Sequence, residues 1–211
     1  MRIPHQLKTA TGVIAGLTTL FSLMILLFGA QEKAAILMGF IPARFGGTMA
    51  ISPAVPAILT PLSATLVHAS LLHLGGNLIM LAWCGMAVER VLGARSIVIL
   101  YLIGAFVAAA AEFLVAPHSA SPMVGASGAI GALIGAFALS YGQHKAIVKS
   151  RLLNRWLNVA WLLVAWIVIQ LGFGYLMGSE GMLVATPAHI GGFIAGVALQ
   201  RPLLIYRYRN A

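Results

Sequence analysis

The chain has 211 residues, of which 61% are hydrophobic and only 8% are charged, and its formal net charge is +9. Because a soluble domain carries about 25% charged residues, this composition excludes a water-soluble globular protein and predicts one membrane domain over residues 1–211. The sequence contains no aspartate, no HExxH pattern and a single cysteine, Cys84, which exclude an aspartyl protease, a zinc protease of that type and an intrachain disulfide.

Apolar runs along the chain predict an all-α polytopic membrane protein with six transmembrane helices. The first run follows Arg2 and Lys8 and could be a cleaved signal peptide, but bulky Phe28 before Ala30 favours an uncleaved anchor. The connection over residues 30–62 is the longest, and its length and mixed polarity indicate a functional external loop that could dip into the outer leaflet. The six predicted spans are residues 11–29, 63–87, 95–115, 124–141, 157–176 and 187–205.

Basic residues fall almost entirely in alternate loops of this topology. If the N-terminus is cytoplasmic, Lys33 and Arg44 are the only two of the 13 lysines and arginines that lie outside. The positive-inside rule then predicts that both termini are cytoplasmic in a multi-pass protein of the cell membrane, with a bacterial inner membrane as the expected location. Basic residues in these loops are explained by contact with the headgroups of the lipid bilayer. The net charge of the chain therefore gives no reason to expect a nucleic-acid partner.

A serine lies at the predicted outer start of the fourth span. Ser127 follows Pro122 and stands between Gly125 and Gly128. Near a helix N-terminus, free backbone N–H groups stabilise an oxyanion, and flanking glycines let a substrate carbonyl approach closely. Taken alone, such a serine is more often part of a small-residue packing face, so the functional interpretation depends on a partner.

His189 is the candidate partner, at the predicted outer start of the sixth span. A few residues inside its helix, it is expected at a depth similar to that of Ser127, and ionisable groups within a membrane are functional candidates. With no aspartate available, we predict a dyad in which His189 is the general base that activates Ser127. Glycines that permit close helix contact recur at Gly131, Gly135, Gly192 and Gly196.

His73 and Asn77 are four residues apart in the second span and therefore share one helix face. As donors they could complete an oxyanion hole with the Ser127 backbone N–H, each contributing about 3 kcal/mol to transition-state stabilisation. The alternative is that the two side chains bond across helices for packing alone. His68 is expected to hydrogen-bond the external loop.

Three motifs in this order resemble the rhomboid family of intramembrane serine proteases. They are HxxxxHxxxN at His68, His73 and Asn77, GxSG at Gly125, Ser127 and Gly128, and AHxxGxxxG from Ala188 and His189 to Gly192 and Gly196. The resemblance implies a six-helix rhomboid-like bundle with Ser127 as nucleophile, His189 as base and His73 with Asn77 as oxyanion donors. It also implies that substrates reach the site between the second and fifth spans.

Two departures from the family pattern concern packing. Gly131 stands where the family usually places an aromatic residue against the histidine, and Phe137 and Tyr141 lie too deep on the same helix to replace it. The external loop has Arg44 but lacks the tryptophan of the family's WR pair. Structural roles are expected for Glu89 and Glu112, and solvated positions for His5, His118 and His144.

The sequence thus predicts an intramembrane serine endopeptidase that cleaves single-span or polytopic membrane proteins near the outer face by acyl transfer, with no cofactor and no metal. One alternative is a non-catalytic rhomboid-like scaffold that binds membrane proteins. A small transporter is disfavoured because the polar residues gather near one face and not at the bilayer centre.

Overall fold

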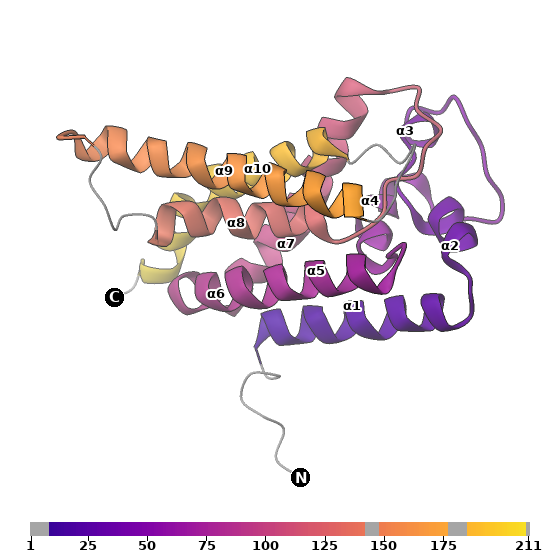
Figure 1. Ribbon diagram of the computed structural model, residues 1–211, viewed down its shortest axis with the longest axis horizontal. Coiled ribbons are helices and arrows are strands. Elements are labelled where there is room, and N and C mark those ends of the chain that lie inside the picture. The colour runs from indigo at the N-terminus through magenta and orange to yellow at the C-terminus, as the bar shows by residue number, and fades with distance from the viewer. Residues whose placement is uncertain (1–8, 142–147, 177–184, 210–211) are drawn as a thin grey trace, which may run out of the picture.

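The computed structural model describes residues 9–141, 148–176 and 185–209, and the regular structure in these ranges is helical apart from one isolated β-bridge. Figure 1 shows the long helices running side by side, with α2, α3 and α4 grouped at one end of the bundle. Within the described residues, five helices are long and apolar enough to cross a membrane. They are α1 (Ala10–Leu27), the continuous pair α5 and α6 (Leu71–Leu92), α7 (Ala94–Val115), α9 (Arg151–Leu176) and α10 (Thr186–Tyr208).

The sixth apolar helix, α8, is short and lies inside the bundle. It covers Ser127–Tyr141, 15 residues, which at about 1.5 Å per residue is shorter than a hydrocarbon core of about 30 Å. The predicted run began at residue 124, but Gly125 has a φ of +108°, which keeps residues before Ser127 out of the helix. The helix that carries Ser127 is therefore shorter than the candidate spans around it, which have 18 to 26 residues. Its residues are buried except for Phe137, Leu139, Ser140 and Tyr141.

Contact between α8 and α10 depends on glycine. A β-carbon on Gly192 would overlap the carbonyl of Gly128, and one on Gly196 would overlap the carbonyl of Ala132. The two backbones therefore touch without intervening side chains, which is the packing that small residues allow between membrane helices. This contact places the first turns of α8 and α10 next to each other.

The second predicted span starts later than its apolar run suggested. Residues Ala57–Leu66 form short helical turns, including α4 (Thr60–Ser63), and α5 (Leu71–Met80) begins only at Leu71. Ser70 caps α5 by accepting a hydrogen bond from the backbone N–H of His73 at 3.1 Å. The helix continues through a π-helical turn, Leu81–Gly85, into α6 (Met86–Leu92). The predicted start of this span at residue 63 was wrong, because the hydrophobicity of the run does not reveal where the N-cap residue Ser70 begins the helix.

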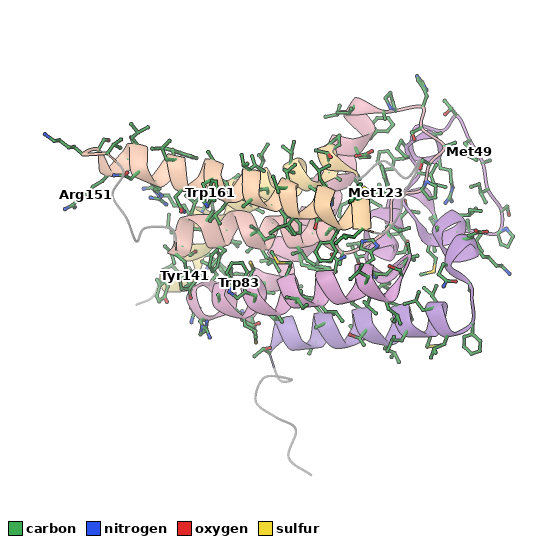
Figure 2. All side chains as sticks on the ribbon, viewed as in Figure 1. Met49, Trp83, Met123, Tyr141, Arg151 and Trp161 are labelled. Carbon is green, nitrogen blue, oxygen red and sulfur yellow. The ribbon has the colours of Figure 1, made fainter. Side chains whose placement is uncertain are left out.

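The predicted external loop contains two short helices, α2 (Gln31–Met38) and α3 (Pro42–Phe45). Arg44 is 9% exposed and its Nη2 donates to the carbonyl of Val55 at 2.8 Å, which ties the loop to itself. Phe40 pairs with Met123 in the β-bridge, and Figure 2 shows Met123 at the same end of the bundle as Met49 of this loop. The loop thus reaches the segment that leads into Ser127.

At the opposite end, Glu89 caps a helix other than its own. Its carboxylate accepts hydrogen bonds from the backbone N–H groups of Ala10 at 2.8 Å and Thr11 at 2.9 Å, and from the Thr11 hydroxyl at 2.6 Å. These groups belong to the first turn of α1, where N–H groups have no partner within the helix and a negative charge is favourable. Arg207 of α10 donates to the carbonyls of Glu89 and Arg90, so α1, α6 and α10 meet here.

Candidate active site

The structure brings Ser127 and His189 together. Ser127 Oγ lies 2.8 Å from His189 Nε2, and the two residues are 7% and 4% exposed. Each stands in the first turn of its helix, so the glycine contact between α8 and α10 sets their separation. A buried hydroxyl in hydrogen-bond contact with an imidazole nitrogen is the arrangement in which the imidazole can take the hydroxyl proton.

The segment before Ser127 is held by backbone hydrogen bonds. Met123 N donates to the Phe40 carbonyl at 2.8 Å, and Gly125 N donates to the Ala64 carbonyl at 2.9 Å. The first intrahelical bond of α8 runs from Ile130 N to the Ala126 carbonyl. The N–H of Ser127 therefore lies in the turn whose donors have no acceptor within the helix, at the positive end of the helix dipole.

His73 and Asn77 face this segment from α5. A β-carbon on Gly125 would lie 2.7 Å from His73 Nε2 and 3.9 Å from Asn77 Nδ2, so both nitrogens point at the backbone two residues before Ser127. Asn77 Nδ2 also donates to the His73 carbonyl at 2.9 Å. The side chains of His73 and Asn77 therefore lie against the backbone that leads into the first turn of α8.

His68 is fully buried and contacts residues other than those the sequence suggested. The Ala126 N–H donates to its Nε2 at 3.4 Å, and its Nδ1 lies 2.8 Å from the Ser22 hydroxyl, which itself donates to the Leu66 carbonyl. These partners require the proton on Nδ1 and the lone pair on Nε2. The expected bond to the external loop is replaced by contacts with α1 and with the residue that precedes Ser127. The ring also packs edge-on against His73, with centroids 4.9 Å apart.

Two residues of α9 contact His189 and were missed by the sequence analysis. The Trp166 ring lies 5.7 Å from the His189 ring at an interplanar angle of 72°, and Gln170 Nε2 lies 3.0 Å from His189 Nε2. At Gly131, where an aromatic residue was expected from the family pattern, a β-carbon would lie 3.2 Å from the His189 carbonyl and 3.2 Å from the Phe193 backbone nitrogen, so a side chain there would press on the backbone of α10. The aromatic contact comes instead from α9. Gln170 is a polar residue in an apolar run, which is a usable sequence signal.

A cavity of about 110 Å³ lies against these side chains. Gln170, His73, Asn77 and Gly125 line it together with Ser127 and His189. The cavity therefore joins the hydroxyl, the imidazole and the converging donors in one space. A reacting carbonyl would fit there within reach of all three.

The remaining predicted residues lie apart from this cavity. Glu112 of α7 reaches the first turn of α10, where the Ala188 backbone hydrogen-bonds its carboxylate. His118 is exposed. His5, His144, Arg2 and Lys8 lie outside the described residues.

Comparison with known proteins agrees with this fold. A sequence profile of the Rhomboid domain matches residues 56–206. The chain is 30% identical over 139 residues to Rhomboid protease GluP of Bacillus subtilis (strain 168), which covers 66% of the chain and 24% of that protein. Over 142 residues it is 30% identical to Rhomboid-like protease 3 of Toxoplasma gondii, covering 67% and 49%. RHOMBOID-like protein 5 of Arabidopsis thaliana is 31% identical over 158 residues, covering 71% and 46%.

These matches and the bundle define a multi-pass integral membrane protein of helical type. The chain belongs to the rhomboid family, which confirms the predicted resemblance and fold class. It spans a quarter to a half of the length of the curated relatives described above. Two of those relatives are named proteases and the third is named only for its likeness to the family.

Proposed function

We propose that this chain is an intramembrane serine endopeptidase that cleaves transmembrane segments of other membrane proteins near the outer face of the bilayer. The observation that carries the proposal is the 2.8 Å contact between Ser127 Oγ and His189 Nε2. The cavity beside that contact is lined by His73 and Asn77, which can donate to an oxyanion. Family membership supports the same reaction class.

In the proposed mechanism, Ser127 Oγ attacks the carbonyl carbon of a peptide bond while its proton passes to His189 Nε2. The negative charge that develops on the carbonyl oxygen is stabilised by the Ser127 backbone N–H together with His73 and Asn77. His189 then gives the proton to the leaving amine, which breaks the peptide bond and leaves an ester on Ser127. A water molecule attacks this ester with His189 again as base, and the acid product is released.

The substrates of this reaction are single-span or polytopic membrane proteins. A peptide bond within an intact helix is shielded by its own hydrogen bonds, so a cleavable segment needs small or helix-breaking residues near the membrane boundary. The chemistry uses no cofactor, no metal and no nucleic acid.

The proposed orientation places both termini in the cytoplasm, in a bacterial inner membrane. It is supported by the basic residues Arg90, Arg95 and Arg207, which cluster around the Glu89 end of the bundle, away from Ser127. A reporter enzyme that works only outside the cytoplasm, fused to the C-terminus, should be inactive. Activity of that fusion would contradict the orientation.

The test is reconstitution in lipid vesicles with a panel of single-span substrates and with a fluorophosphonate that labels activated serines. We expect wild type to cleave at least one substrate and to be labelled, and Ser127→Ala to lose both activities. His189→Ala should lower cleavage about 1000-fold or more, since it removes the base. An unlabelled wild type that binds substrates without cutting them would instead establish the scaffold alternative.

A further inference from the structure

The amide of Gln170 and the hydroxyl of Ser127 approach the same nitrogen of His189. Gln170 Nε2 lies 3.0 Å and Ser127 Oγ 2.8 Å from His189 Nε2. Gln170 stands one helical turn after Trp166 on α9, so both side chains lie on the helix face that contacts His189. Two side chains of α9 therefore meet His189: the polar Gln170 at the reacting nitrogen and the aromatic Trp166 against the ring.

The chemistry of these two groups decides where the histidine proton lies. The nitrogen of a primary amide can only donate a hydrogen bond, so the imidazole nitrogen that faces it must carry the lone pair. In neutral His189 the proton is then on Nδ1, and Nε2 is free to accept. This is the tautomer that a base needs if it is to receive the proton of Ser127.

Serine proteases with a triad secure this tautomer through a carboxylate at Nδ1. The present sequence has no aspartate, and His189 Nδ1 is buried with no hydrogen-bond partner among the described residues. The tautomer therefore has no support on the Nδ1 side within the described part of the chain. Support is available on the Nε2 side, from α9.

We propose that Gln170 is a positioning residue that selects the basic tautomer of His189 by donating its amide N–H to Nε2. The inference rests on the proposed function and adds a third group to the dyad. The Ser127 hydroxyl shares the same lone pair, so the ring is held with that lone pair directed between its two donors. When the Ser127 proton moves to Nε2, the Gln170 amide turns over so that its oxygen accepts the new N–H, and Gln170 therefore stabilises the imidazolium as well as the basic tautomer. Gln170 itself gains and loses no proton.

The opposite orientation of the amide has the opposite consequence. A Gln170 side chain turned by 180° would present its oxygen, which accepts, and the proton of His189 would then lie on Nε2. Such a histidine cannot take the proton of Ser127, and Gln170 would hold the site inactive. Removal of the amide should therefore slow the labelling of Ser127 if the nitrogen faces His189, and speed it if the oxygen does.

The test replaces Gln170 by side chains of similar size that cannot donate, in Gln170→Met and, independently, in Gln170→Leu. Loss of one net hydrogen bond that favours the reactive tautomer should slow fluorophosphonate labelling of Ser127 about five-fold. Thermal stability should change little. Leu171→Ala, at the adjacent lipid-exposed position of α9, is the matched control and should label at the wild-type rate.

The second readout is the ¹⁵N spectrum of histidine-labelled protein, in which the His189 signals are identified by their loss in His189→Ala. Wild type should show the proton on Nδ1, and the Gln170 variants should show increased protonation of Nε2, a change that a purely structural role would not produce. An unchanged tautomer, or faster labelling in both variants, overturns the proposal. If wild type is not labelled at all, the proposed function fails, while the spectrum still decides whether Gln170 selects the tautomer.

Discussion

Replacement of Gly125 by alanine should disrupt the converging donors without touching Ser127 or His189. Gly125 has a φ of +108°, a region in which an L-residue is strained by about 1–3 kcal/mol. The added β-carbon would also lie 2.7 Å from Nε2 and 2.8 Å from Cε1 of His73, closer than nonbonded atoms approach. Because the His73 ring must move away, its proposed contact with the oxyanion is lost. Removal of one such donor costs about 3 kcal/mol, so the reaction should slow by about 100-fold or more.

The assay for Gly125→Ala is cleavage of a reconstituted substrate, with fluorophosphonate labelling and thermal unfolding measured in parallel. Gly75→Ala is the matched control, since Gly75 is on the same helix as His73 and a β-carbon there meets no atom within 4 Å. The control should be active and slightly more stable, because alanine favours a helix over glycine by up to about 1 kcal/mol. A folded Gly125→Ala protein that cleaves within about three-fold of wild type would refute the oxyanion assignment, since the roughly 100-fold loss above would be missing.

The structure makes two further predictions, one for each end of the bundle. Trp166→Ala should lower the free energy of unfolding by about 3–5 kcal/mol and also slow labelling of Ser127, because it empties the space beside the His189 ring. Trp166→Phe should retain most of the stability and most of the labelling rate. Equal effects of the two variants would argue against the ring contact. Glu89→Gln should lower the free energy of unfolding by about 2 kcal/mol, because the neutral amide caps α1 more weakly, and should leave the labelling rate of the folded protein unchanged. A loss of labelling without a loss of stability would contradict the capping role of Glu89.

The sequence was sufficient to predict that Ser127 and His189 meet. Each residue lies near the start of an apolar run, and glycines recur at four-residue spacing on the same faces, so depth and close approach could both be inferred. The i, i+4 spacing of His73 and Asn77 likewise indicated a common direction. These inferences use only the period of a helix and the thickness of a membrane.

The contact of Trp166 with His189 could not be inferred in this way, whereas Gln170, a polar residue in an apolar run, did carry a signal. Trp166 contacts His189 only because α9 presents one particular face to α10, and the rotation of a largely apolar helix is not encoded in its hydrophobicity. The start of α5 at Leu71 was also missed, because a single Ser70 cap outweighs an apolar run that continues before it. The partners of His68 depend on the path of α1, whose buried face is marked by the small polar residues Thr11, Thr18 and Ser22, a pattern that the sequence analysis did not use.

The short length of α8 has a consequence for the membrane itself. Hydrolysis needs water, but a wet passage through the whole bilayer would let ions and protons leak. Because α8 begins at Ser127, the cavity lies at one end of this helix, and at its other end the Phe137 ring centroid lies 5.0 Å from Trp83 and 5.0 Å from Tyr141. Most residues of α8 between these two ends are buried, so water that reaches Ser127 from the end of the helix need not pass along it, and the proposed hydrolysis would not require an ion leak across the membrane.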